Sequence, residues 1–169
     1  MNCTLDTNAL ILWSSTKTNE LTIARLDNLF EIISKSGGVV ILPTPAISEL
    51  LIKTDSGTTA WLAALQRRSA VKVAPFDLRA AVECALISRL GDGTKAGKRA
   101  GTKPGEAYQK IKVDRQIAAI ARVSGSDLLV TDDEGLIKIC EFINIPTSRV
   151  VSLDLPASAM QSGLPFEAR

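Results

Sequence analysis

Five short apolar runs alternate along the chain with longer stretches of helical periodicity, and this alternation constrains the fold more than any other feature. The runs are NCTL (2–5), VVIL (39–42), VKVAPF (71–76), DLLVT (127–131) and RVVSL (149–153). Between them, apolar residues recur at helical spacing, as Leu26, Leu29 and Ile33 do within residues 19–37. Short buried strands separated by helices are typical of a parallel sheet with helices on both faces. We therefore predict an α/β fold of this kind, built as one domain from the 169 residues.

The sequence predicts where two of the helices begin. Thr44 and Pro45 have the pattern of an N-cap followed by proline at the first helical position. The stretch DRQIAAIARVSG (114–125) is helical in its spacing, and Asp114 is expected to open that helix.

The absence of histidine excludes several kinds of chemistry. Catalysis by Ser-His-Asp or Cys-His groups cannot occur, and neither can a zinc site built on histidine. The three cysteines, Cys3, Cys84 and Cys140, lie far apart and form no CxxC pair, so a bound metal would be a hard cation held by oxygen. If the protein is an enzyme, we expect carboxylates to carry its chemistry.

The cysteines also bear on the compartment. They lie in apolar surroundings and are odd in number, which indicates reduced core residues of a cytoplasmic protein. The sequence has no signal-type segment and no apolar run long enough to span a bilayer. We therefore expect neither secretion nor a membrane partner.

Acidic residues follow the predicted strands at the points where these end. Asp6 follows the first strand, and Glu49 lies in the first turns of the helix after the second. Asp132 and Asp133 come directly after DLLVT, and Asp114 heads the preceding helix. In a parallel sheet, the carboxyl ends of the strands lie along one edge, where ligands bind. These acids are therefore predicted to face a common site.

A purely structural explanation fits some of these acids better than others. An aspartate at a helix start is a favoured N-cap, worth about 1 kcal/mol, and needs no function. Glu49 resists this explanation, because a capping box based on Thr44 would place its acid at position 47, which is Ile47. Asp114 heads an apolar stripe of its helix, with Ile117 at the next turn. Carboxylates directed inward are costly unless a positive group meets them, so their pattern indicates a cation site.

Three segments together resemble a known family. The order LDTNALI, PTPAISELL and VDRQIAAIARVSGSDLLVTDD is similar to that of PIN domains, particularly the VapC-type ribonuclease toxins of toxin–antitoxin pairs. The resemblance covers nearly the whole chain. It implies a PIN-like three-layer α/β/α fold with a twisted, mainly parallel sheet of about five strands. It also implies a metal-dependent endoribonuclease.

By motif position, the resemblance assigns roles to individual residues. Asp6, Glu49, Asp114 and Asp133 would be catalytic, with Asp132 as the alternative to Asp133. The expected ion is Mg²⁺ or Mn²⁺, held by Asp6, Asp114 and Asp133, while Glu49 would position the attacking water. The supporting polar residues would be Thr7, Asn8 and Thr131.

A segment rich in glycine and lysine interrupts the pattern at about residues 91–112. Residues 92–115 hold seven basic and three acidic side chains, although the whole chain has a net charge of only +2. The simplest interpretation is a solvated loop, but the segment leads directly to Asp114, which favours contact with a phosphate backbone. The basic residues predicted to bind RNA are Lys95, Lys98, Arg99, Lys103, Lys112 and Arg115. We predict a nuclease domain over residues 1–155, containing this insert, and a C-terminal tail over 156–169.

The resemblance also implies partners. These are an RNA substrate, a cognate antitoxin and a second copy of the chain in a homodimer. Trp13 and Trp61 lie on apolar helical stretches, where we expect core residues rather than interface anchors. Two alternatives remain: a catalytically inactive PIN-like module that binds RNA or protein, and a PIN nuclease of RNA processing.

Overall fold

The fold is built around a five-stranded sheet in which all strands are parallel. A computed structural model describes residues 1–53, 56–92 and 107–161. The strand order is β3-β2-β1-β4-β5. The strands are β1 (Cys3–Leu5), β2 (Val40–Pro43), β3 (Val71–Ala74), β4 (Leu128–Val130) and β5 (Thr147–Ser148). The prediction of a parallel sheet of five strands is confirmed.

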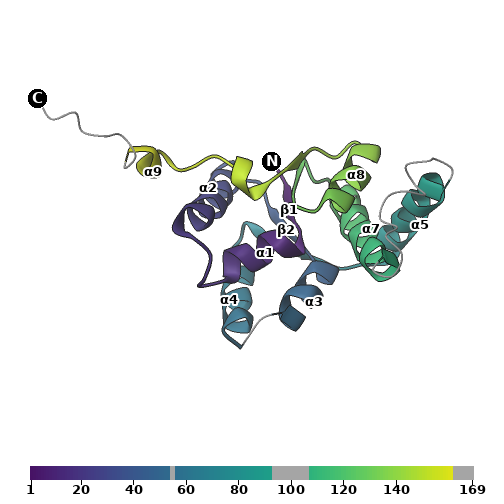
Figure 1. The fold of residues 1–169 in the computed structure, drawn as a ribbon, viewed down its shortest axis with the longest axis horizontal. Coiled ribbons are helices and arrows are strands. Elements are labelled where there is room, and N and C mark those ends of the chain that lie inside the picture. Colours follow the sequence, from purple (N-terminus) through teal and green to yellow (C-terminus); the bar gives the residue numbers. More distant parts are fainter. Residues whose placement is uncertain (54–55, 93–106, 162–169) are drawn as a thin grey trace, which may run out of the picture.

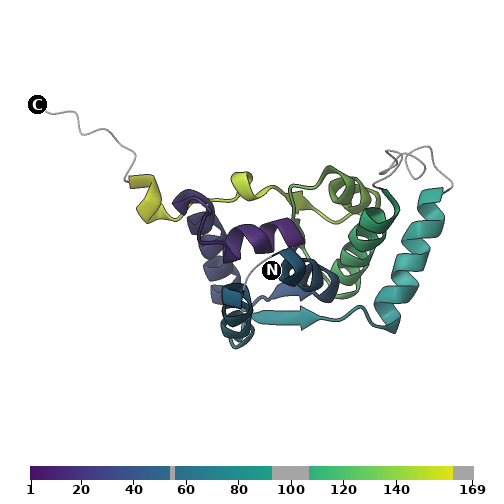
Figure 2. The same ribbon diagram turned by 60° about the horizontal axis from the view of Figure 1, so that its bottom comes forward.

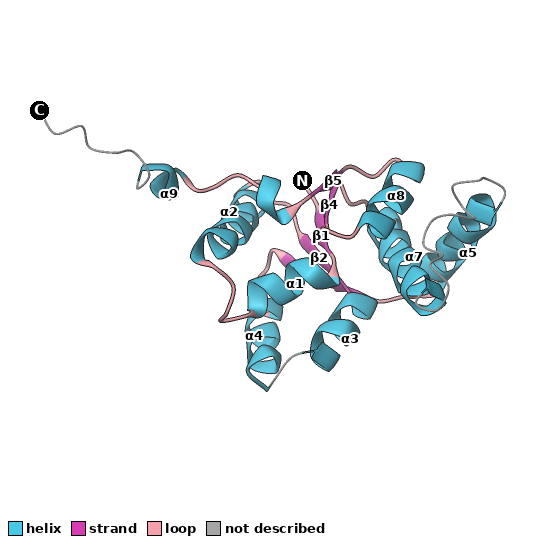
Figure 3. Cartoon of the chain, viewed as in Figure 1, coloured by secondary structure: helices cyan, strands magenta, loops and turns pink. Residues whose placement is uncertain are grey.

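Helices connect successive strands and cover both faces of the sheet (Figures 1 and 3). They are α1 (Thr7–Ser14), α2 (Glu20–Lys35), α3 (Thr44–Lys53), α4 (Ser56–Gln66), α5 (Leu78–Asp92), α7 (Ala107–Val123), α8 (Glu134–Phe142) and α9 (Ala157–Gln161). In Figure 3 the sheet stands between α1, α2 and α4 on one side and α5, α7 and α8 on the other. Figure 2 shows α5 at the right-hand edge of the fold, packed alongside α7. None of the helices in these ranges is long and apolar enough to cross a membrane.

The core follows the alternation of side chains along β2. Ile41 packs in one cluster with Ala80 of α5 and Ile120 of α7. Val40 and Leu42 point to the opposite face and join the main cluster. The three strand residues are almost completely buried, so both faces of the sheet are covered, as a parallel sheet requires.

The two tryptophans form an aromatic group with Phe30. Trp13 is buried, and its ring centroid lies 5.6 Å from that of Trp61 and 5.8 Å from that of Phe30. Its indole Nε1 donates a hydrogen bond of 2.8 Å to Asp27. Trp13 is therefore a core residue with a satisfied donor, as expected, and Trp61 packs half-buried against it.

The last strand differs from the prediction. β5 is Thr147–Ser148, and the run predicted as a strand at 149–153 contains a 3-10 helix, η1 (Val150–Ser152), instead. The backbone N–H groups of Leu129 and Thr131 donate to the carbonyls of Pro146 and Ser148, so β4 pairs upstream of the predicted run. Val150 and Leu153 are buried while Val151 is exposed, which is a spacing of three rather than two.

Two helix starts also differ from the prediction. α7 begins at Ala107, so residues 107–112 of the predicted insert are helical and Asp114 lies inside the helix rather than at its start. The predicted N-cap at Thr44 is wrong, because Thr44 is the first residue of α3. Its Oγ1 instead accepts a hydrogen bond of 3.1 Å from the Phe76 N–H beyond β3. The predicted tail begins with α9, and the domain boundary at 155 stays a prediction.

Candidate active site

A cleft lies at the carboxyl ends of the two central strands. The chain leaves β1 for β2 on one side, whereas β4 pairs with β1 on the other, so this is the point where the strand order reverses. Ligands bind at such a point in open α/β sheets. The cleft has a volume of about 170 Å³ and is lined by Asp6, Thr7, Asn8, Glu49, Lys53, Asp114, Ile117, Asp133 and Leu136. Four of the predicted acids, brought by different elements, thus face one space.

Asp6 lies at the end of β1 and is only 3% exposed. Its Oδ1 accepts a hydrogen bond of 2.8 Å from the Ala9 N–H, which makes it the N-cap of α1. Its Oδ2 accepts a hydrogen bond from the Thr131 hydroxyl. Burial raises the pKa of Asp6 from 3.8 to about 6, against the lowering effect of these two hydrogen bonds, and the charges of Asp132 and Asp133 add to the rise. Asp6 is therefore the N-cap of α1, and burial makes its ionised form unfavourable.

Glu49 reaches the cleft from the middle of α3. It is half-buried, and its Oε2 accepts a hydrogen bond of 2.7 Å from the Thr7 hydroxyl. Thr7 is the first residue of α1 and is 5% exposed. One hydroxyl group therefore holds Glu49 beside the strand end that carries Asp6.

Asp114 occupies an interior position of α7, seven residues after Ala107 at its start and nine before Val123 at its end. A helix cap cannot explain an aspartate there, because capping applies only to the first turn. Aspartate is also a poor residue for a helix interior. Its Oδ2 instead lies against α8, 3.4 Å from the position that a β-carbon on Gly135 would occupy.

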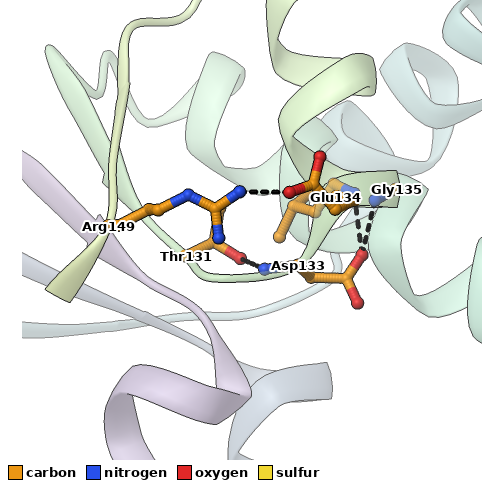
Figure 4. A network of polar contacts seen from close by, with 6 residues as sticks. Thr131, Asp133, Glu134, Gly135 and Arg149 are labelled. Atoms are coloured by element: carbon orange, nitrogen blue, oxygen red, sulfur yellow. Dashed lines mark hydrogen bonds and ion pairs between the residues drawn. The ribbon is translucent and has the colours of Figure 1, made fainter. Parts of the chain in front are cut away.

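Asp133 lies between β4 and α8. Its Oδ1 accepts hydrogen bonds from the N–H groups of Gly135 at 2.7 Å and Leu136 at 3.0 Å, so it is the N-cap of α8 (Figure 4). Its own N–H donates to the Thr131 hydroxyl at 3.0 Å. Because that hydroxyl also donates to Asp6, the buried Thr131 links the two aspartates. Figure 4 further shows Arg149 paired with Glu134 at the start of α8.

The other predicted site residues differ in their placement. Asn8 is exposed and lines the cleft, whereas Asp132 is not among the lining residues. Lys112 and Arg115 are not among the lining residues either; their charges lower the pKa of Cys84 on α5, although burial raises that pKa overall. Lys95, Lys98, Arg99 and Lys103 lie outside the described residues.

Lys53 was missed by the sequence analysis. It is exposed, lies on α3 one helical turn after Glu49, and is the basic side chain among those that line the cleft. The four-residue spacing from Glu49 could have indicated it, because residues at that spacing share a helix face.

Comparison with known proteins decides the family. The profile of the PIN domain matches residues 3–141. The chain belongs to the PIN domain family. The PIN domain covers every strand except β5, and all four cleft acids fall within it. No curated protein matches the chain.

Solved structures show the same fold at low identity. A chain of VapBC2 from Rickettsia felis, in a crystal structure with a DNA fragment from the promoter, has a TM-score of 0.60 and 16% identity, over 88% of this chain and 98% of that one. A chain of DNA-bound VapBC from Salmonella typhimurium has a TM-score of 0.57 and 18% identity, over 89% and 98%. Both likenesses extend over nearly the whole of the compared chains.

PIN nucleases generally use divalent metal ions, and the cleft fits such an ion in chemistry. Its acidic ligands are all oxygen donors, which suit hard cations. The buried carboxylate of Asp6 is a charge that a cation would relieve. Among the described residues, however, no three acids already lie close enough together to hold an ion. The donors therefore match Mg²⁺ or Mn²⁺ in kind, and they line one space without converging on one point.

The hydroxyl of Thr7 offers a direct test of how this PIN domain positions Glu49. Thr7→Val keeps a branched side chain of similar size but removes the donor to Glu49. We expect activity to fall about tenfold, because one hydrogen bond to a charged group contributes roughly 1.5 kcal/mol or more. Thr7→Ser should keep most of the activity. Equal nuclease rates for the valine and serine variants would contradict this role.

Proposed function

We propose that this protein is a metal-dependent endoribonuclease of the VapC type, the toxin of a toxin–antitoxin pair. The observation that carries the proposal is the placement of Asp114. It lies inside α7, where it caps nothing, yet its carboxylate borders the same cleft as Asp6, Glu49 and Asp133. Capping explains Asp6 and Asp133 one at a time, but it does not explain why four acids from different elements line one cleft. This set of acids matches what hydrolysis of a phosphodiester with a hard cation requires.

The roles of the acids follow from their surroundings. Asp6, Asp114 and Asp133 would hold the cation, and a bound Mg²⁺ or Mn²⁺ would neutralise charge on the phosphate and lower the pKa of water. Asp6 and Asp133 are anchored through their Oδ1 atoms as helix caps, which fixes where both side chains stand. Glu49, oriented by Thr7, would accept a hydrogen bond from the attacking water and take up its proton. Ile117 and Leu136 form the apolar part of the wall.

The basic residues would bind the substrate backbone. Lys53 supplies a positive charge at the cleft itself, where it can contact a phosphate next to the scissile one. The lysines and arginine of residues 95–103 would extend this contact along the strand. Phosphate contacts of this kind give affinity without choice of sequence.

Substitution of the basic residues tests this assignment. We expect Lys53→Ala to raise KM and to lower the log–log slope of RNA binding against salt by roughly 0.7, the value for one phosphate contact of a single strand. Combined alanine substitutions at Lys95, Lys98, Arg99 and Lys103 should lower the slope by about 0.7 for each contact made. Lys35→Ala, on the exposed side of α2, serves as the control. Filter binding at several salt concentrations would contradict the proposal if the slope and affinity stay at the wild-type values.

An antitoxin and a second copy of the chain are the proposed protein partners. The fold is shared with chains of two VapBC structures, which supports an antitoxin of the VapB kind. A homodimer is proposed from the resemblance to VapC-type proteins alone. Light scattering of the purified protein at micromolar concentration checks it, and a strictly monomeric mass would contradict it.

The substrate class is tested by direct comparison. Purified protein should cut a single-stranded RNA in the presence of Mg²⁺ and leave a DNA of the same sequence intact. If the protein cuts both RNA and DNA, it is a nuclease, but the proposed specificity for RNA is wrong. Binding of RNA without any cutting would favour the inactive PIN-like module, whereas cutting of one defined precursor without arrest of growth in a bacterial host would favour RNA processing.

A further inference from the structure

We propose that Gly135 is a positioning residue, which sets the space between the carboxylates of Asp114 and Asp133 and thereby the size of cation that the cleft accepts. This inference rests on the proposed function, because it concerns the same cation site. Gly135 itself has no side-chain atom that could bind the cation.

The geometry around Gly135 is tight on the side that faces the acids. A β-carbon at Gly135 would lie 3.0 Å from Asp133 Oδ1 and 3.4 Å from Asp114 Oδ2. The distance to Asp133 is tighter than most contacts of a β-carbon, and the distance to Asp114 is at the short end of ordinary van der Waals contact. Position 135 therefore borders both carboxylates, one from the start of α8 and one from the interior of α7, and a side chain there would press first on Asp133.

Neither carboxylate can move away from position 135 without weakening contacts that hold it in place. Asp133 Oδ1 accepts hydrogen bonds from the N–H groups of Gly135 and Leu136, and a shift of a few tenths of an ångström would lengthen them. Asp114 is fixed on α7, which packs directly against α8. A methyl group on residue 135 would thus act as a wedge that rests against Asp114 and pushes Asp133 away from it.

The backbone does not explain the glycine. Gly135 lies in the first turn of α8 with ordinary helical geometry, unlike Gly37 and Gly125, whose φ angles are +69° and +66°. Alanine is the better helix former at such a position. A glycine here is therefore needed for space and not for conformation.

The wedge has a consequence for cation selectivity. Mg²⁺ requires near-ideal octahedral geometry with ligands at about 2.0–2.1 Å, whereas Ca²⁺ accepts flexible geometry at about 2.3–2.6 Å. Separation of Asp114 and Asp133 should therefore weaken Mg²⁺ binding more than Ca²⁺ binding. For Gly135→Ala we expect a 10- to 100-fold loss of Mg²⁺ affinity, the range found when residues that orient metal ligands are changed.

The test measures cation binding and stability, not only activity. Isothermal titration with Mg²⁺ and with Ca²⁺ is run on wild type, Gly135→Ala and Gly57→Ala, the last placing the same methyl on α4, away from the cleft. The proposal expects a loss confined to Gly135→Ala and larger for Mg²⁺, with an unchanged or higher Tm in EDTA. In a double-mutant cycle, the effect of Gly135→Ala should largely vanish when Asp133 is also changed to alanine, because the methyl then has room.

The outcomes separate this inference from the proposed function. If wild type binds Mg²⁺ and cuts RNA, but Gly135→Ala binds both cations like wild type, the positioning role is overturned and the nuclease stands. A large fall of the Tm of Gly135→Ala in EDTA also overturns it, because the glycine would then serve folding. If wild type binds neither cation and cuts nothing, both proposals fail.

Discussion

Asp114→Asn should abolish RNA cleavage and leave the metal-free protein folded and at least as stable as wild type. Asparagine has nearly the same size, and Asp114 caps no helix, so the main change is the loss of one negative charge beside the other cleft acids. Loss of a cation ligand removes several kcal/mol of transition-state stabilisation, which corresponds to a rate loss of roughly a thousandfold or more. Single-turnover cleavage of a labelled RNA measures the rate, and urea unfolding in EDTA measures the stability.

Asp132 and Asp133 supply a matched pair of controls for this result. They are neighbours in the sequence, but only Asp133 is among the residues lining the cleft. Asp133→Asn keeps a residue that caps helices well and should nevertheless lose activity as Asp114→Asn does. Asp132→Asn should cut RNA at close to the wild-type rate. The reverse pattern would make Asp132 the fourth acid.

Asp6→Asn should give the second large effect, a metal-free protein that is more stable than wild type at neutral pH and inactive. Burial raises the pKa of Asp6 to about 6 in the folded protein, above the ordinary 3.8. Between pH 3.8 and about 6, the carboxyl group of Asp6 is therefore protonated in the folded state and ionised in the unfolded state. The stability that this proton contributes is complete below pH 3.8 and is lost as the pH rises through about 6. Since one pKa unit corresponds to 1.36 kcal/mol, the loss approaches about 3 kcal/mol.

The pH dependence distinguishes this explanation from a simple helix cap. In EDTA, Asp6→Asn should exceed wild type in free energy of unfolding at pH 8, and the difference should shrink toward pH 4. Mg²⁺ at a hundred times its Kd should stabilise wild type by about 2.7 kcal/mol and the variant by less. A residue that served only as a cap would behave differently: its replacement by asparagine would leave activity and the response to Mg²⁺ intact at every pH. Urea unfolding at pH 4.5, 6 and 8 provides the comparison.

The central part of the fold could be predicted because periodicity and strand ends are local signals. The strands from β1 to β4 coincide with apolar runs. Because parallel strands end at a common edge, the sequence also predicts that Asp6 and Asp133 lie near each other. The same reasoning failed at β5. The apolar residues Val150, Val151 and Leu153 have the composition of a strand, but pairing with β4 is decided by tertiary contacts at Pro146 and Ser148.

The details of the site depended on where helices begin, which sequence determines poorly. The glycines before residue 106 hide the start of α7, so the sequence predicts that Asp114 opens this helix, whereas it lies in its interior. The role of Lys53 could not be predicted from the sequence, because it depends on the cleft that this side chain lines. Gly135 gave no signal either, because crowding between side chains of α7 and α8 exists only after the two helices pack.

Cleavage of RNA under control of the cation tests the central claim most directly. Wild type and Asp114→Asn are purified in parallel, and each is given the same fluorescent RNA in EDTA, then in excess Mg²⁺. We predict that wild type is inactive in EDTA, cuts when Mg²⁺ is added, and stops when EDTA is restored, while Asp114→Asn stays inactive throughout. Cleavage that persists in EDTA, or that appears equally in Asp114→Asn, would contradict it.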